Sequence, residues 1–251
     1  MDAPVDVVGR VGTVLRAVSS FEPTGATTSA VAHLAGLPRP TTHRLLTSLL
    51  DIGFVDRDRN GGWLLGPELY LMGETAAPRY DVTQVAQPFV RRLAVATGES
   101  AFFSTRRGDE TVCLLREDGS FPIRSHVLYE GIRFPLGVAS AGLAIASFLP
   151  PREVEHLLST DLTGAYGAAH TPEAIRARIA QTQRLGYAVN PGLIVEGSWG
   201  LGAAVFDHAG EPRWALSLTG IEQRFDDERR QAMGERLLQE AHDLSTALRA
   251  R

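Results

Sequence analysis

Residues 36–46 read GLPRPTTHRLL, and they constrain the fold more tightly than any other stretch of the chain. Pro38 and Pro40 fix the backbone just before a leucine-rich amphipathic pattern. Proline is tolerated in the first turn of a helix, where the missing N–H has no intrahelical acceptor, and it is disfavoured further along. The segment therefore predicts a tight turn that opens a helix over about residues 38–51.

The two faces of this predicted helix differ in character. When the leucines of residues 45–50 are placed at the buried centre, a rotation of 100° per residue also turns Thr42 inward. The outer surface is short and polar, and the residues on it or beside it are Pro40, Thr41, His43, Arg44 and Thr47. A helix that enters the major groove of DNA needs such a surface in its first turns, because Arg can reach guanine and Thr a thymine methyl group or a phosphate.

The flanking segments predict the rest of a small DNA-binding domain. Apolar spacing indicates a first helix around residues 11–18, and a second short helix that is capped near Thr28, carries Val31 and Leu34, and stops at Gly36. After the third helix, GFVDRDRNGGWLLG predicts a hairpin with a two-residue Asn-Gly turn. This order is that of a winged helix-turn-helix. We expect DNA contacts from Thr28, Arg39, Pro40, Thr41, His43, Arg44, Thr47, Arg57 and Arg59.

Because the chain as a whole is acidic, any contact with DNA has to come from a local cluster of basic residues. The chain has 25 basic and 29 acidic residues and a net charge of −4, so blanket nucleic-acid binding receives no support. Residues 1–77 hold six arginines against eight acids, but four of the six arginines lie in the third helix and the hairpin. Two alternatives remain open at this point. One is an ordinary three-helix bundle with a surface arginine, and the other is a sensor whose N-terminal helices bind a protein partner.

The remainder of the chain predicts a second domain of mixed α+β type. A helix from Pro67 and a joint at residues 77–84 precede a helix that Pro88 kinks or bounds. Alternating runs then predict two strands over 100–118 and a third over 123–131. Helices follow near 140, 151–158 and 172–184, then two strands over 199–220 and a terminal helix from about residue 226. We expect a DNA-binding domain over 1–65, a linker over 66–82 and a second domain over 83–251.

Composition and spacing argue against several other classes of protein. The single cysteine, Cys113, excludes an internal disulfide and a multi-cysteine zinc site, and its apolar surroundings in TVCLLRE predict a buried, inert thiol. The seven histidines show no metal-binding spacing, so we expect neither a metal nor a cofactor. The N-terminus lacks the features of a signal peptide and no run approaches 18 apolar residues, which predicts a cytoplasmic protein without a membrane segment.

Two stretches come close to enzyme motifs without matching them. GVASAG, residues 137–142, has one residue too many before Ser140 for a nucleophile elbow. GLGAAV, residues 200–205, lacks the third glycine of a dinucleotide fingerprint and is explained by strand packing. We expect no catalytic residue and no enzymatic activity.

Three stretches in order resemble the IclR family of bacterial transcription regulators over nearly the whole chain. They are GLPRPTTHRLLTSLLDIGFVDRD, FPLGVASAGLAIAS, and RLGYAV followed by GSWGLGAAVFD and WALSLTG. The resemblance implies an N-terminal winged helix, a linker helix that helps dimerise and a C-terminal GAF-like α/β effector-binding domain. It also implies a homodimer or homotetramer that binds a double-stranded DNA operator under the control of a small-molecule effector, an organic acid or a related metabolite.

The resemblance also implies an effector pocket, at positions that match Ile123, His126, Ser140, Ala141, Asn190, Gly200, Ser217 and Thr219. Backbone N–H groups at the predicted helix start, Ser140 and Ala141, favour an anion, and the hydroxyls of Ser217 and Thr219 point to the same side of one strand. Gly200 stands where the family often has a cysteine, so we expect a ligand larger than a two- or three-carbon acid. Pro40 stands where the family usually has a small polar residue, which predicts one phosphate contact fewer.

Overall fold

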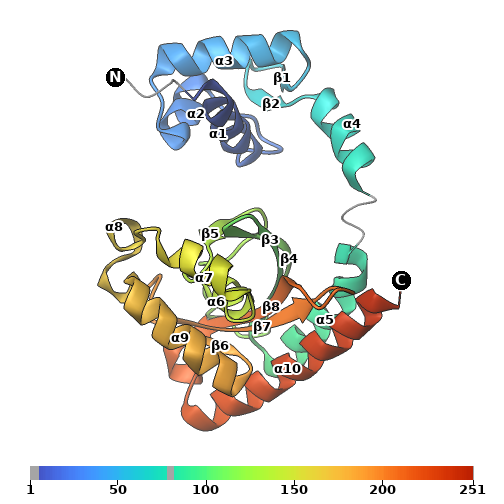
Figure 1. Ribbon diagram of the computed structural model, residues 1–251. Helices are drawn as coiled ribbons and strands as arrows, with labels where there is room; N and C mark the ends of the chain where they lie inside the picture. The colour runs from blue at the N-terminus through green and yellow to red at the C-terminus, as the bar shows by residue number, and fades with distance from the viewer. Residues whose placement is uncertain (1–5, 78–81, 251) are drawn as a thin grey trace. The chain divides into compact units, whose positions relative to one another are not determined.

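In the computed structural model the described residues are 6–77 and 82–250, and the chain forms two compact units, residues 1–80 and 81–251 (Figure 1). The first unit is mainly helical with a small hairpin, and the second is built on a six-stranded sheet. The α+β organisation expected from the sequence is confirmed.

The N-terminal unit has three helices, a two-stranded hairpin and a fourth helix. Its elements are α1 (Val7–Ser19), α2 (Thr28–Ala35), α3 (Arg39–Asp51), β1 (Val55–Arg57), β2 (Trp63–Leu65) and α4 (Pro67–Ala76). Thr27 caps α2 by accepting from the Ala30 N–H, and Gly36 ends α2 at a positive φ of 64°, which favours glycine. The capping threonine, the glycine stop and the proline-led start of α3 together fix the helix-turn-helix.

One compact core joins these elements. Val14 and Val18 of α1, Val31 of α2 and Leu46 of α3 are fully buried, and Trp63 of β2 closes the core at 1% exposure. Leu34 lies on α2 as the sequence predicts, but it is 54% exposed and does not join this core. The second helix is only eight residues long, and at its C-terminal end the chain already turns towards α3.

The hairpin loop is longer than the predicted two-residue turn. Arg57 pairs with Trp63, so the loop spans residues 58–62. The Asp58 carboxylate accepts hydrogen bonds from the backbone N–H groups of Asn60 and Gly62, at 2.8 and 2.7 Å. The loop is therefore shaped by an aspartate cap in addition to the positive φ of Gly61.

The second unit is built on one antiparallel sheet with the strand order β5-β4-β3-β8-β7-β6. The strands are β3 (Ser100–Arg107), β4 (Glu110–Glu117), β5 (Arg133–Pro135), β6 (Ala188–Pro191), β7 (Ser198–Phe206) and β8 (Pro212–Ile221). β3 and β8 lie in the middle and pair with each other, so the first strand of the unit pairs with its last one. β6 forms one edge, and β5 forms the other.

Helices cover both faces of this sheet (Figure 1). One face packs against α5 (Val82–Thr97) and α10 (Asp227–Arg249), and the other against α6 (Ser140–Ala146), α7 (Pro151–Leu158) and α9 (Pro172–Leu185). The short helices α8 (Thr163–Tyr166), η2 (Ala168–His170) and η3 (Glu222–Arg224) complete the unit. Phe102 and Phe103 show the two-residue period directly, because each is fully buried on a different face.

Three details differ from the sequence-based prediction. Residues 123–131 form no strand, and the third strand of that region is the three-residue β5 further along. A four-residue strand, β6, was not predicted, because it is too short to show a period. α5 runs through Pro88 without ending there, so Pro88 does not bound the helix.

Candidate nucleic-acid interface and effector cavity

The faces of α3 fall as the helical wheel predicts. Thr42, Leu46 and Leu49 are buried, and the Thr42 hydroxyl donates to the Pro38 carbonyl at 3.2 Å. The opposite face is polar, and its exposed residues are Arg39, Pro40, His43, Arg44, Thr47 and Ser48. Thr41 is half-buried between the two faces. The exposed row of polar and basic side chains on α3 therefore begins in the first helical turn, which also contains Pro40.

Two of the expected DNA-contacting hydroxyls already have partners within the unit. Thr28 is half-buried, and its Oγ1 accepts from the indole N–H of Trp63 at 2.9 Å. The Thr47 hydroxyl donates to the His43 carbonyl one turn back, at 2.9 Å. The Thr28 hydroxyl accepts this bond and keeps its own O–H free to donate to a phosphate. The Thr47 hydroxyl has already donated its one O–H, so it would have to give up the bond to His43 to donate to a phosphate.

The hairpin presents its two arginines differently. The Arg57 guanidinium lies 3.9 Å from the centre of the Trp63 ring and donates to the Gly61 carbonyl at 3.2 Å. Arg59 is exposed near the tip, and its side chain forms no hydrogen bond or ion pair with another described residue. Arg57 is therefore oriented along the hairpin, and Arg59 extends from it.

A hollow of about 390 Å³ joins the start of α2, the start of α3 and the hairpin tip. Thr28 and Arg39, both expected from the sequence, line it together with Ser29, Asn60 and Gly61. Ser29 and Asn60 were not among the expected contacts, although a hydroxyl at a helix start and an asparagine at a hairpin tip are both recognisable signals. The hollow unites the three elements that a winged helix sets against the DNA backbone.

In the second unit, four of the expected effector residues line one small cavity. Ser140, Asn190, Gly200 and Thr219 meet there from α6, β6, β7 and β8. The cavity has a volume of about 20 Å³, which is room for a single water molecule. Side chains not expected from the sequence close it, namely Val127, Leu128, Ile194, Ser198 and Trp199.

The hydroxyl groups in and beside the cavity differ in whether they have a hydrogen-bond partner. The Ser140 hydroxyl donates to the Leu201 carbonyl at 3.2 Å. Among the described residues the hydroxyls of Ser217 and Thr219 are buried and have no hydrogen-bond partner. These two stand opposite Gly202 and Gly200 in the β7–β8 pairing, so both face the side of the sheet on which Ser140 lies. A buried hydroxyl without a partner is costly, which makes this a place where a ligand or water would be held.

Asn190 has a structural task beside the cavity. Its Nδ2 donates to the Val138 carbonyl at 2.8 Å, and its Oδ1 accepts from the Leu193 N–H at 2.9 Å. The amide therefore ties the segment before α6 to the loop after β6. A second contact joins a different segment to this region: the hydroxyl of Ser125, in the loop 122–131, and the hydroxyl of Ser198, at the start of β7, form a hydrogen bond of 2.6 Å.

The other expected positions do not line the cavity, and Ser217, two residues before Thr219 on β8, is one of them. Ala141 is buried, and its backbone nitrogen packs against β7, since a Cβ at Gly202 would lie 2.9 Å from it. Ile123 is 65% exposed and its carbonyl accepts from Arg224 at 3.2 Å, while His126 is exposed. The loop that carries Ile123 and His126 turns Val127 and Leu128 to the cavity instead.

Comparisons with known proteins agree with this architecture. The IclR helix-turn-helix domain model matches residues 7–59, and the model of the C-terminal domain of bacterial IclR transcriptional regulators matches residues 74–246. The repressor AllR of Escherichia coli strain K12 is 32% identical over 218 residues, covering 84% of this chain and 79% of its own. The regulator KipR of Bacillus subtilis strain 168 is 28% identical over 221 residues, covering 87% of this chain and 88% of its own.

A solved structure supports the same conclusion. The IclR homolog of Microbacterium hydrocarbonoxydans, crystallised with 4-hydroxybenzoate, superposes with a TM-score of 0.77 at 26% identity, over 97% of this chain and 99% of that one. The fold and the two surfaces define a winged-helix DNA-binding regulator with an effector domain. The chain belongs to the IclR family of bacterial transcriptional regulators.

Membership of this family decides between the functional alternatives. The chain is a DNA-binding transcriptional regulator under effector control and not an enzyme, and N-terminal helices that bind only a protein partner are not favoured. No helix in residues 6–77 and 82–250 is long and apolar enough to cross a membrane.

Proposed function

We propose that α3 is the recognition helix and that Arg44 reads a base edge in the major groove of the operator. The observation that carries this proposal is the division of α3 into a buried face at Thr42, Leu46 and Leu49 and an exposed face that includes Arg44. Arg44 lies in the second turn of the helix and is exposed, and Arg is the residue that pairs most often with guanine.

The neighbouring polar residues would hold the DNA backbone. Arg39, Thr41, His43 and Thr47 surround Arg44 on the helix, and Thr28 lies across the hollow from the hairpin tip. The two hairpin arginines, Arg57 and Arg59, would lie along an adjacent groove or phosphate row. Pro40 contributes van der Waals contact only, so the grip on the phosphates depends on Arg39 and on the hairpin.

The second unit would hold the effector at the cavity beneath the loops 122–131 and 192–198. Support comes from the hydroxyls of Ser140 and Thr219, which line the cavity, and from the apolar side chains of Val127 and Ile194, which line it as well. The hydroxyl of Thr219 is buried without a partner among the described residues. A ligand with hydrogen-bonding oxygens at one end and an apolar body fits this combination. We infer a small organic acid or a related metabolite. The ligand of the Microbacterium relative, 4-hydroxybenzoate, likewise has a carboxylate at one end and an apolar ring.

Binding requires the cavity to expand. A volume of about 20 Å³ excludes any organic acid, so the loops above it must separate before an effector enters. Such a step would couple effector binding to the structure of the surrounding loops. In a protein with two conformations, an effector acts by favouring the conformation that binds it more tightly.

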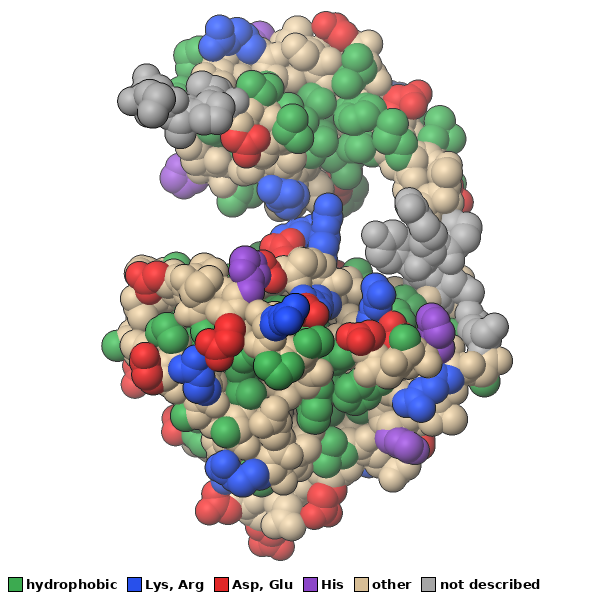
Figure 2. Space-filling view, in the orientation of Figure 1, with side chains coloured by type: hydrophobic (Ala, Val, Ile, Leu, Met, Phe, Trp, Pro, Cys, Tyr) green, Lys and Arg blue, Asp and Glu red, His purple; other side chains and the backbone are tan. Residues whose placement is uncertain are grey.

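Self-association would complete the regulator. Tyr70, Leu71 and Met72 of α4 are 67%, 55% and 52% exposed, and α4 buries none of its residues. Val8 of α1 is 82% exposed. Figure 2 shows hydrophobic side chains gathered on one face of the N-terminal unit. A second copy of the chain would cover them, which gives a homodimer or a tetramer of such dimers acting on a palindromic site in the cytoplasm.

The test is operator binding by full-length protein, measured by fluorescence anisotropy on the DNA upstream of its own gene. Arg44→Ala should weaken specific binding by about 1–3 kcal/mol, the cost of one lost bidentate arginine. Arg10→Ala, which removes an exposed arginine of α1, should change binding far less. Equal affinities for wild type and Arg44→Ala would contradict the assignment of α3.

A further inference from the structure

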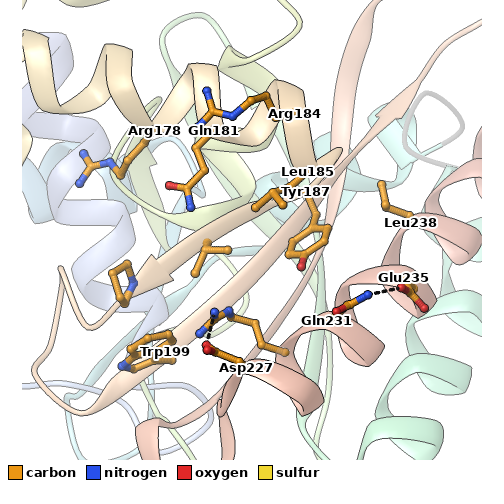
Figure 3. A pocket seen from close by; sticks show the side chains of 13 residues that line it. Arg178, Gln181, Arg184, Leu185, Tyr187, Trp199, Asp227, Gln231, Glu235 and Leu238 are labelled. Atoms are coloured by element: carbon orange, nitrogen blue, oxygen red, sulfur yellow. Dashed lines mark hydrogen bonds and ion pairs between the residues drawn. The ribbon is translucent and has the colours of Figure 1, made fainter.

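A cleft of about 730 Å³ shares only Trp199 with the lining of the effector cavity. It runs between α9 and α10 across the edge strand β6 (Figure 3). Because α9 covers one face of the sheet and α10 the other, the cleft wraps around the open edge of the sheet. Its volume is that of an ordinary small-molecule site.

One wall of the cleft carries a cation whose charge is not balanced. Arg178 of α9 lines the cleft, and its Nε and Nη2 are buried without a hydrogen-bond partner among the described residues. Burial lowers the pKa of Arg178, which reflects the cost of holding a guanidinium away from water. Buried guanidinium groups are normally paired, so Arg178 is an exception that needs a physical reason.

Two neighbouring arginines, unlike Arg178, form ion pairs with carboxylates. Arg176, two residues earlier on α9, bonds Glu155 at 3.1 Å. Arg230, on the α10 wall, bonds Asp227 at 2.6 Å. Arg178 has no such carboxylate partner among the described residues, so an anion in the cleft would supply one.

Aromatic side chains form the opposite wall. Figure 3 shows Trp199 and Tyr187 on the strand side of the cleft, with the Tyr187 ring directed towards α10. The Tyr187 ring packs closely against α10 at Gly234, where an added Cβ would lie only 2.4 Å from the ring. Trp199 is held by Phe225 at 6.3 Å between ring centres and by the Arg230 guanidinium at 5.6 Å. These rings are therefore positioned in advance, and they suit a flat apolar body.

We propose that this cleft is a second ligand site, which takes a small organic anion with an aromatic body, such as an aryl carboxylate or aryl phosphate. The anionic group bonds Arg178, and the ring lies against Trp199. Trp199 also borders the effector cavity from its place between Ser198 and Gly200. A ligand in the cleft would therefore lie beside β7, which also lines the effector cavity. The two sites have no polar side chain in common other than that of Trp199.

The test is isothermal titration of the full-length protein with phenyl phosphate, with benzoate and inorganic phosphate as comparison probes. Wild type should bind phenyl phosphate and benzoate more tightly than inorganic phosphate. Arg178→Gln should weaken phenyl phosphate binding roughly 10-fold, because a charge-assisted hydrogen bond is lost. Arg176→Gln, the matched variant on the same helix, should bind as wild type does.

A further variant keeps the proposal testable if Arg178→Gln does not fold. Trp199→Leu should weaken phenyl phosphate binding and leave inorganic phosphate binding unchanged. Unchanged phenyl phosphate binding in Trp199→Leu would overturn the proposal. So would a change of oligomeric state in Arg178→Gln, which would make the cleft a contact between copies of the chain.

Discussion

The hydroxyl of Ser125 lies 2.6 Å from the hydroxyl of Ser198, and this hydrogen bond joins the two loops above the effector cavity. Ser198 itself lines the cavity, and Ser125 precedes Val127 and Leu128, which also line it. A ligand that expands the cavity has to separate these loops, so the bond lies on the route that opens the site.

We predict that Ser198→Ala loosens both loops. One neutral hydrogen bond contributes about 0.5–1.5 kcal/mol, so local opening should become roughly 2- to 10-fold more frequent. Hydrogen exchange measured by mass spectrometry should quicken in residues 122–131 and 192–198 together. Ser159→Ala removes an exposed hydroxyl that bonds only the His156 carbonyl, and it should leave both loops unchanged. Faster exchange in one loop alone would show that the bond does not couple them.

Two glycines of β7 should respond differently to the same substitution. A Cβ at Gly202 would lie 2.4 Å from the Ser140 carbonyl oxygen, which is backbone and cannot move away easily. A Cβ at Gly200 would lie 3.1 Å from the Ser140 hydroxyl, which can rotate. Gly202→Ala should lower the free energy of unfolding by about 1–3 kcal/mol or more, and Gly200→Ala by less. Urea unfolding of both variants checks this, and a smaller loss for Gly202→Ala would contradict it.

The bond from Trp63 to Thr28 should stabilise the N-terminal unit. Thr28→Val leaves the Trp63 indole N–H buried without its acceptor, which costs about 1–3 kcal/mol. We expect an earlier transition of this unit in urea, followed by circular dichroism. Thr24→Val is the control, since Thr24 is exposed and its hydroxyl bonds only the Phe21 carbonyl. Equal transitions for the two variants would show that the indole finds another partner.

The buried His170 should make the second unit sensitive to acid. Burial lowers the pKa of His170 below its usual 6.5, and the nearby Arg178 lowers it further against the opposing hydrogen bond to the Tyr166 carbonyl. Between the lowered folded pKa and 6.5 the unfolded chain binds more protons, so stability falls as the pH falls through this window. His170→Gln should flatten that dependence, and His208→Gln, at an exposed position, should not. Thermal unfolding between pH 5 and 7.5 would reveal an unchanged slope if His170 plays no part.

The single cysteine should be unreactive in the folded protein. Burial raises the pKa of Cys113 to about 12, and the nearby Glu130 acts in the same direction. The thiolate is the reactive form, so iodoacetamide at pH 8 should label the native chain roughly 100-fold or more slowly than the unfolded chain. Rapid labelling of native protein, followed by mass spectrometry, would mean that β4 opens readily.

Much of the N-terminal unit could be predicted because its signals are local. Gly36, the two prolines and the leucine spacing act within one or two turns of chain, and they decide where α3 begins and which face it buries. The effector cavity was harder to predict. Ser140, Asn190, Gly200 and Thr219 were expected on the strength of a family resemblance, and nothing local in the sequence indicated that Val127, Leu128 and Ile194 would close over them.

The sequence by itself determined most of the helices and the longer strands, and which way α3 faces, because these depend on periods of 3.6 and 2 residues that the chain displays directly. The tertiary structure alone decided that the Thr28 hydroxyl serves Trp63, that Asn190 ties two loops, and that residues 123–131 cover a cavity instead of forming a strand. Each of these depends on groups far apart in the chain that meet only after the sheet has formed. Arg178 belongs with them, because the sequence shows an arginine on a helix and only the fold shows that two of its side-chain nitrogens are buried with no partner among the described residues.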